Sequence, residues 1–168
     1  MRAKRALDAA GSLALLLILA PLLILLTAAS VATSAGPPFT RRTAAGLYGR
    51  PFETLKFRIA PTPLGRLLDR YALDELPQLV NVLRGEMSLV GPRPLPARDP
   101  ACTVHRLEVR PGITGLWQVG ARSDLPWEEM SLLDLHYIEH HWLGMDLAIL
   151  VRTVPAALRP RRSRLRVA

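Results

Sequence analysis

The apolar positions divide the chain into a continuous run near the N-terminus and a longer remainder in which they recur at helical or strand spacing. Residues 13–35 form a run of 23 positions without a charge, which is long enough to cross a bilayer as a helix. Pro21 lies near the middle of this run, where it removes a helix hydrogen bond and favours a kink or a break. The pattern predicts a membrane-associated segment over residues 1–35.

Basic residues flank this segment on both sides. Arg2, Lys4 and Arg5 precede the apolar run, and Arg41 and Arg42 follow it. Because positive charge marks the cytoplasmic ends of membrane segments, we expect both ends in the cytoplasm, joined by a re-entrant hairpin of helix, break and helix. A single span is one alternative. A cleaved signal peptide is another, although the run exceeds the roughly 7 to 15 residues of a signal-peptide core.

The remaining pattern predicts short elements. Residues 36–51, rich in Gly, Pro and Thr, indicate a loop, and residues 52–58 alternate as a strand with Lys56 and Arg58 on one face. Helices are predicted over residues 63–71, 74–84, 127–141 and 146–158, and a strand within residues 109–119. The predicted fold class is α+β and mostly helical. It comprises a re-entrant hairpin (1–35), a small cytoplasmic domain with amphipathic interfacial helices (36–158) and a basic tail (159–168).

The helix predicted over residues 74–84 begins with two adjacent carboxylates, Asp74 and Glu75. Its expected apolar stripe consists of Leu76, Leu79, Val80 and Leu83. Asp74 is the expected N-cap, Pro77 fits the first turn and Gly85 is the expected end. A carboxylate at the positive end of a helix stays ionised, so Asp74 can serve as a nucleophile or a metal ligand. Its spacing alone favours the commoner role of a simple cap.

The balance of charge indicates an anionic partner. The chain has 22 Lys and Arg against 14 Asp and Glu, a formal net charge of +8, which fits a phosphorylated substrate, anionic lipid or nucleic acid. The basic tail favours lipid headgroups, whereas the lack of an interleaved aromatic and basic pattern speaks against nucleic acid. Cys102 is the only cysteine, which excludes an intrachain disulfide and a Cys-based zinc site.

Several side chains could handle a phosphorylated substrate. They are the cations Lys56, Arg58, Arg93 and Arg122 and the carboxylates Asp74, Glu75, Glu86 and Asp134. This mixture indicates phosphoryl transfer with Mg²⁺, which needs only one or two carboxylates besides substrate phosphates and water. A competing motif, His136-x-x-Glu139-His140, has the spacing of a zinc-peptidase helix, but no third ligand in a matching context follows it.

With these residues in place, the chain resembles the bacterial sugar transferases of the monotopic phosphoglycosyl transferase family, which start exopolysaccharide or glycan synthesis on a polyprenyl phosphate. The likeness covers nearly the whole chain. It comprises Lys4, Arg5 and Asp8, Gly36-Pro37, Gly46, residues 49–52, Lys56-Phe57-Arg58, residues 73–94 (LDELPQLVNVLRGEMSLVGPRP), residues 109–119 (VRPGITGLWQV), Arg122 and residues 133–137.

The resemblance implies a catalytic domain over residues 36–158 on the cytoplasmic face of the bacterial inner membrane. It implies that Asp74 attacks the sugar-linked phosphate of a UDP-sugar and releases UMP, after which undecaprenyl phosphate takes up the phosphosugar. Glu75 would hold Mg²⁺, and Asp134 would orient a partner or support the metal. The phosphates would be neutralised by Lys56, Arg58, Arg93 and Arg122. The sugar, the pathway and the oligomeric state are not determined by the sequence.

The chain also departs from the family pattern. The departures are Ala20 before the hairpin proline, Arg42 and Ala44 in place of Gln-x-Arg, a missing acidic stretch after residue 58, Asp69 in place of an arginine, Leu107 in place of a histidine, and Gly120-Ala121 in place of Asn-Gly. Because Asp69 removes an expected cation near Asp74, a catalytically degenerate, membrane-anchored paralogue is the alternative to an active enzyme.

Overall fold

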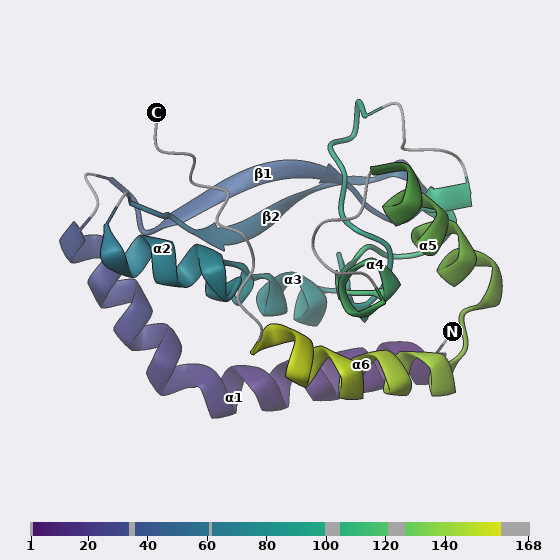
Figure 1. Ribbon diagram of the computed structural model, residues 1–168, viewed down its shortest axis with the longest axis horizontal. Helices are drawn as coiled ribbons and strands as arrows, with labels where there is room; N and C mark the ends of the chain where they lie inside the picture. The colour runs from purple at the N-terminus through teal and green to yellow at the C-terminus, as the bar shows by residue number, and fades with distance from the viewer. Residues whose placement is uncertain (1, 34–35, 61, 100–104, 121–126, 159–168) are drawn as a thin grey trace.

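A long N-terminal helix and a small α+β domain packed on it make up the protein (Figure 1). The computed structural model describes residues 2–33, 36–60, 62–99, 105–120 and 127–158. Its helices are α1 (Arg2–Thr33), α2 (Pro63–Arg70), α3 (Gln78–Arg84), α4 (Leu116–Val119), α5 (Trp127–His140) and α6 (Leu143–Ala157), with 3₁₀ helices η1 (Leu47–Gly49), η2 (Leu73–Glu75) and η3 (His105–Glu108). Its strands are β1 (Phe39–Ala45), β2 (Pro51–Phe57), β3 (Ser88–Val90) and β4 (Gly112–Thr114). The predicted α+β, mostly helical class is confirmed, and the basic tail lies outside the described residues.

The N-terminal segment forms one helix rather than two. α1 runs over 32 residues with Pro21 inside it, and its ribbon bends along its length without interruption (Figure 1). A proline removes one backbone hydrogen bond and usually kinks a helix, and here the helix continues through that defect. The break expected between two half-helices is therefore absent. By length and composition, α1 is apolar enough to cross a membrane.

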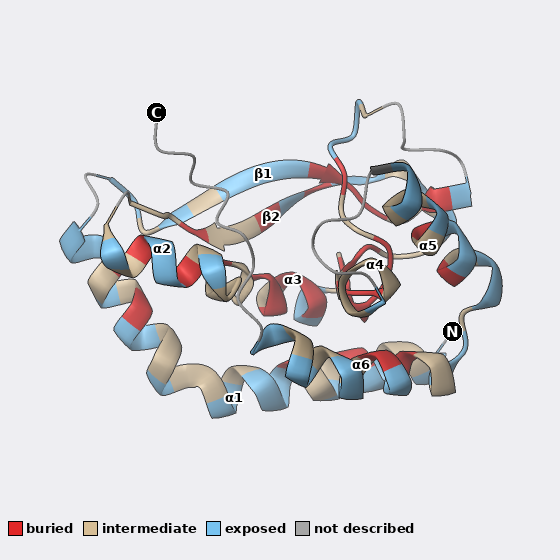
Figure 2. Ribbon diagram, viewed as in Figure 1, coloured by how far each residue is buried: buried red, intermediate tan, exposed pale blue. Residues whose placement is uncertain are grey.

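Two hydrophobic clusters hold α1 against the rest of the chain. The larger cluster includes Val82, Met87 and Ile149, and Leu16 and Leu19 of α1 pack against it. The smaller cluster joins Leu26 of α1 to Phe57 of β2 and Leu68 of α2. The opposite face of α1 stays exposed, as Figure 2 shows, and carries Leu17, Ile18, Ile24 and Leu25. One side of α1 therefore belongs to the core, and the other is apolar but uncovered.

The segment predicted as a loop contains a strand. β1 pairs antiparallel with β2 from Phe39 opposite Phe57 to Ala45 opposite Pro51, so the assignment of residues 36–51 to a loop is wrong. Most of β1 is exposed, with only Ala44 and Ala45 buried, and it therefore lacks the apolar alternation that reveals a half-buried strand. Hydrogen bonding to β2 holds this segment extended. β2 itself confirms the strand predicted over residues 52–58.

Helix α3 is shorter than predicted and buries a different face. It begins at Gln78 and ends before Gly85, whose φ of 87° lies in the left-handed region, so the predicted glycine stop is confirmed. The buried side chains of α3 are Gln78, Leu79, Asn81 and Val82. Leu83, predicted to be part of the buried stripe, is 38% exposed. The apolar stripe was misplaced because two buried positions are amides, which hydropathy counts as polar.

The short strands β3 and β4 run parallel, with Ser88 opposite Gly112 and Val90 opposite Thr114. This pairing requires the backbones to approach closely, because a Cβ on Gly112 would lie 2.1 Å from the amide nitrogen of Gly91. Beyond β4 the chain enters α4, where the prediction had only a strand. The pairing places the turn after β3 beside residues 112–117.

Helices α5 and α6 confirm the two helices predicted over residues 127–141 and 146–158. Helix α6 buries Asp146 and Ile149, and both α6 and α1 run along the lower edge of the molecule in Figure 1. The outer face of α6 is apolar and exposed, with Leu143, Leu147, Val151 and Val154 each at least 43% exposed. Such an exposed apolar face is what we expect of an interfacial helix.

Candidate functional site

The carboxylate pair lies on a strained connection between α2 and α3. Helix α2 ends at Arg70, and Ala72 then adopts a left-handed conformation with φ of 53° directly before η2, which carries Asp74 and Glu75. A non-glycine residue in this region costs on the order of 1 kcal/mol. Backbone hydrogen bonds on either side hold it, from Ala72 N to Asp69 O at 3.2 Å and from Glu75 N to Ala72 O at 3.1 Å. The connection thus fixes the direction in which the two carboxylates leave the backbone.

Asp74 is not the N-cap of α3. The residue in that position is Pro77, and no side chain caps α3. The sequence placed Asp74 at the helix because it read η2 and α3 as one helix. The capping role is therefore wrong, and another environment decides the protonation of this carboxyl.

A cavity of about 460 Å³ opens beside the pair. It is lined by β1 and β2, the η2–α3 connection, the turn after β3, and the β4–α4 segment, including Arg42, Lys56, Glu75, Gln78, Arg93 and Trp117. Its volume falls in the range of small-molecule sites. Three cations and two carboxylates, Glu75 and Asp99, are among its lining residues. An anionic ligand of modest size is the natural occupant of such a cavity.

Asp74 is buried and close to other charges. Its side chain is only 9% exposed, and burial, followed by repulsion from Glu75, raises its pKa from 3.8 to about 6, against the opposing attraction of Lys56. Lys56 Nζ lies 2.8 Å from Glu75 Oε1. Glu75 lines the cavity, and Asp74, which is not among its lining residues, interacts electrostatically with both Glu75 and Lys56. A pKa near 6 leaves Asp74 mostly ionised at neutral pH, as expected, but burial and neighbouring charges rather than a helix pole set that pKa.

Arg93 reaches the cavity from a braced turn. Its backbone nitrogen donates to Asp134 Oδ2 at 3.3 Å, and its carbonyl accepts from Arg106 Nη2 at 3.0 Å. Arg106 and Asp134 form an ion pair with both side chains buried. The Arg93 guanidinium lies over the ring of Trp117, 5.5 Å from its centroid. Asp134 therefore contacts the turn that carries Arg93 and does not line the cavity.

Arg106 has a structural importance that the sequence did not reveal. It is 7% exposed, and burial raises the pKa of Asp134 while Arg106 opposes that shift. Residues 106 and 134 are 28 positions apart, and no motif links them. Only the fold brings this cation and this carboxylate together.

Two of the predicted phosphate-binding cations are not placed at the cavity. Arg58 donates from Nε to the carbonyl of Pro37 at 2.8 Å and is not among the lining residues. Arg122 lies outside the described residues, as does Cys102. Of the predicted cations, the structure brings Lys56 and Arg93 together at the cavity, joined by the unpredicted Arg42.

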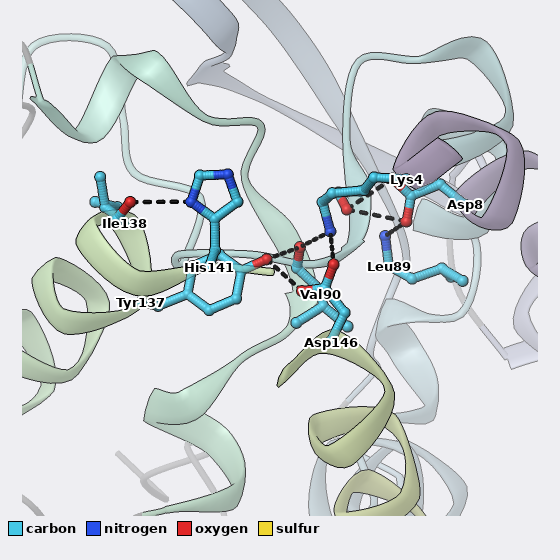
Figure 3. A network of polar contacts seen from close by, with 9 residues as sticks. Lys4, Asp8, Leu89, Val90, Tyr137, Ile138, His141 and Asp146 are labelled. Carbon is cyan, nitrogen blue, oxygen red and sulfur yellow. Dashed lines mark hydrogen bonds and ion pairs between the residues drawn. The ribbon is translucent and has the colours of Figure 1, made fainter. Parts of the chain in front are cut away.

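A polar network fastens the first turns of α1 to the domain beside this site (Figure 3). Asp8 accepts from Leu89 N at 3.0 Å, and Ser88 Oγ lies 2.8 and 3.0 Å from its two oxygens. Lys4 Nζ donates to Val90 O at 3.1 Å and to Asp146 Oδ2 at 2.7 Å. The Tyr137 hydroxyl lies 2.6 Å from Asp146 Oδ1 and 3.1 Å from Val90 O. We call Lys4, Asp8, Ser88, Tyr137 and Asp146 the α1 clasp; through β3 it leads directly into the turn of Arg93.

The histidine motif does not assemble into a metal site in the described part of the chain. His136 and His140 stack on α5 with ring centroids 4.6 Å apart, and His140 Nδ1 lies 3.1 Å from His136 O. Among the described residues, no group of three or more His, Cys, Asp or Glu side chains could hold a metal ion. The zinc-peptidase alternative therefore finds no ligand set there.

Comparisons with known proteins identify the family of this chain. The family model described as bacterial sugar transferase matches residues 1–61 and 59–160. A UDP-glucose:undecaprenyl-phosphate glucose-1-phosphate transferase of Caulobacter vibrioides is 40% identical over an alignment of 186 residues, covering 92% of this chain and 69% of the relative. The exopolysaccharide production protein ExoY of Rhizobium meliloti is 33% identical, covering 96% and 88%. An undecaprenyl-phosphate galactose phosphotransferase of Salmonella typhimurium is 33% identical, covering 93% and 40%. The chain therefore belongs to the bacterial sugar transferase family.

Proposed function

We propose that this protein is a phosphoglycosyl transferase that moves a sugar-1-phosphate from a UDP-sugar to undecaprenyl phosphate, the first membrane step of exopolysaccharide or glycan synthesis. The observation that carries the proposal is the pair of buried Asp74 and partly buried Glu75 beside a cavity lined by Lys56, Arg93 and Arg42. The relatives named as transferases to undecaprenyl phosphate support the same reaction.

The reaction proceeds in two displacements. In the first, a carboxylate oxygen of Asp74 attacks the β-phosphorus of the UDP-sugar, a P–O bond forms to the enzyme, and the bond to UMP breaks with UMP taking the electron pair. In the second, a phosphate oxygen of undecaprenyl phosphate attacks the same phosphorus and the Asp74 carboxylate leaves, so that a diphosphate bond replaces the acyl phosphate. Lys56 and Arg93 neutralise the phosphate oxygens as charge shifts between them.

Mg²⁺ fits this donor set. Glu75 offers a carboxylate at the cavity wall, and one or two carboxylates suffice where substrate phosphates and water complete the shell. Glu75 would hold the ion, which neutralises the diphosphate when bound. Lys56 Nζ lies 2.8 Å from Glu75 Oε1, so a cation held by Glu75 would leave Lys56 to pair with a substrate phosphate.

We place the domain at the cytoplasmic face of the bacterial inner membrane, with α1 re-entrant, and the contacts of α1 support the re-entrant part of this arrangement. At one end, Lys4 and Asp8 bind β3 and α6 through the α1 clasp. At the other end, the Ser30 hydroxyl lies 3.4 Å from Pro38 O and 3.3 Å from Arg58 O. Both ends of the helix therefore contact the same small domain, which a straight span with its ends on opposite sides would not allow. The exposed apolar face of α6 would pack against lipid acyl chains.

Release of UMP tests the reaction. Membrane-extracted protein is incubated with a panel of UDP-sugars, Mg²⁺ and undecaprenyl phosphate, and we expect UMP from at least one sugar, dependence on Mg²⁺ that EDTA removes, and none from Asp74→Asn. With a UDP-sugar labelled in its β-phosphate and no acceptor, label should stay on the protein, and peptide mapping distinguishes Asp74 from Glu75. Wild-type protein that releases no UMP from any sugar would instead support the catalytically degenerate paralogue.

Cysteine accessibility tests the topology. In a Cys102→Ser background, single cysteines at Arg2 and Arg41 are treated in sealed cells with a membrane-impermeant thiol reagent. The re-entrant arrangement predicts that neither position is labelled from outside and that both are labelled after lysis. Labelling of one position alone in sealed cells would establish a single span.

A further inference from the structure

Gln78 is a buried side chain in the wall of the cavity. It is the first residue of α3 and follows Glu75, the last residue of η2, by three positions. Only 2% of it is exposed, yet it lines the same cavity as Lys56, Glu75 and Arg93. It lies within the family block 73–94, but the sequence assigned it no role of its own.

The amide of Gln78 has no hydrogen-bond partner among the residues that the structure describes. Asn81, on the same helix and fully buried, shows the contrast. Its oxygen accepts from Leu55 N at 3.1 Å, and its nitrogen donates to Glu53 O at 2.7 Å and to Glu86 Oε2 at 2.6 Å. Buried amides are almost always paired because an unpaired one loses its hydration without replacement. Asn81 follows this rule within the fold, whereas the Gln78 amide borders the cavity, where its partner comes from solvent or from a bound ligand.

We propose that the side-chain amide of Gln78 binds a ring hydroxyl of the substrate, next to the diphosphate. The inference rests on the proposed function, since it takes a UDP-sugar as the occupant of the cavity. Lys56 and Arg93 are cations suited to phosphates, whereas a neutral amide has one donor group and one acceptor and matches a group that both donates and accepts, as a hydroxyl does. Glu75 and Gln78 line the same cavity, so the Gln78 amide is placed near the carboxylate proposed to hold Mg²⁺ on the diphosphate.

A UDP-sugar presents such hydroxyls on two rings, the transferred sugar and the ribose. Both rings adjoin a phosphate, and both offer hydroxyls of the same chemistry. A hydroxyl on the transferred sugar would make Gln78 a determinant of sugar choice. A hydroxyl on the ribose would make it a contact for every UDP-linked substrate.

The test substitutes Gln78→Met, which keeps the length of the side chain and removes both polar groups, and uses Asn81→Leu as the matched control on the same helix. We expect Gln78→Met to melt at or above the wild-type temperature and to lower kcat/KM for the UDP-sugar about tenfold, the effect of one lost hydrogen bond. Asn81→Leu should instead lower the melting temperature, because it leaves Leu55 N and Glu53 O unpaired. A drop in melting temperature for Gln78→Met as large as that for Asn81→Leu would overturn the inference.

Inhibition by UMP separates the two rings. If the hydroxyl is on the transferred sugar, the inhibition constant of UMP is the same for Gln78→Met and wild type. If it is on the ribose, the inhibition constant of UMP rises about tenfold in Gln78→Met. The variant and wild type should then have equal kcat/KM for a UDP-sugar that lacks the contacted hydroxyl, which is either the 2′-deoxy or the 3′-deoxy form. If the inhibition constant of UMP rises and the variant still has a lower kcat/KM than wild type for both deoxy substrates, the contact is to uracil or phosphate. That result would contradict the proposal.

The same experiment distinguishes this inference from the function beneath it. If wild type is active and Gln78→Met changes neither kcat/KM nor the inhibition by UMP, the proposed role of Gln78 is overturned. The proposed transferase function still holds in that case. A wild type that releases no UMP from any UDP-sugar overturns the proposed function, and the assignment of Gln78 with it.

Discussion

Replacing Asp74 with asparagine should stabilise the protein at neutral pH while abolishing its activity. The pKa of Asp74 rises from 3.8 to about 6 on folding, mainly because the carboxyl is buried and secondly because of Glu75. The folded state therefore binds this proton more tightly than the unfolded chain does. The stability linked to Asp74 is fully present below about pH 3.8 and is lost as the pH rises through about 6.

The magnitude follows from the size of the shift. A difference of about two pKa units, at 1.36 kcal/mol per unit, corresponds to ~3 kcal/mol at pH 7.5 as an upper limit. The attraction of Lys56 is already included in this net shift. Asparagine has nearly the same shape but no charge, so Asp74→Asn should recover most of that free energy. For a chain of this length the gain corresponds to roughly 5–10 °C in the apparent melting temperature.

The assay is thermal unfolding in detergent, followed by tryptophan fluorescence at pH 7.5 and pH 4.5. We expect Asp74→Asn to melt higher than wild type at pH 7.5 and the difference to shrink at pH 4.5, where wild-type Asp74 is protonated. Asp134→Asn is the matched control, since it leaves the buried Arg106 without its partner and should lower the melting temperature. Equal melting temperatures for Asp74→Asn and wild type at pH 7.5, or a gain that does not depend on pH, would refute the reasoning.

Three other substitutions test the cavity, the α1 clasp and the exposed face of α6. Lys56→Met removes the attraction that lowers the pKa of Asp74, so the acidic limb of the pH–rate profile should move to higher pH; a limb that stays in place would contradict a nucleophilic role for Asp74. Lys4→Met leaves the carboxylate of Asp146, which is 1% exposed, without its cation and should cost ~3–5 kcal/mol in unfolding free energy. Adding Asp146→Asn should restore part of that loss, and no restoration would argue against the ion pair. Leu147→Glu, on the exposed face of α6, should weaken flotation with anionic liposomes without lowering the melting temperature.

The sequence predicted those elements whose signals are local. The helices at residues 63–71 and 127–141 were found because caps, prolines and periodic apolar positions act within a few residues. Strand β1 was missed because its faces are mostly exposed and it is held extended by β2. The buried face of α3 was misplaced because Gln78 and Asn81 are polar residues buried for reasons of hydrogen bonding and cavity lining.

By itself, the sequence determined the apolar N-terminal segment, the carboxylate pair and the likeness to the sugar transferases, because each depends on residue types along a short stretch of chain. Only the tertiary structure decided the chemistry of the pair, since the pKa of Asp74 is set by burial and by charges brought to it from β2. Likewise, only the tertiary structure joined Arg106 to Asp134 and Lys4 to Asp146. Their residues lie 28 and 142 positions apart, and electrostatic interactions depend on distance in space rather than along the chain.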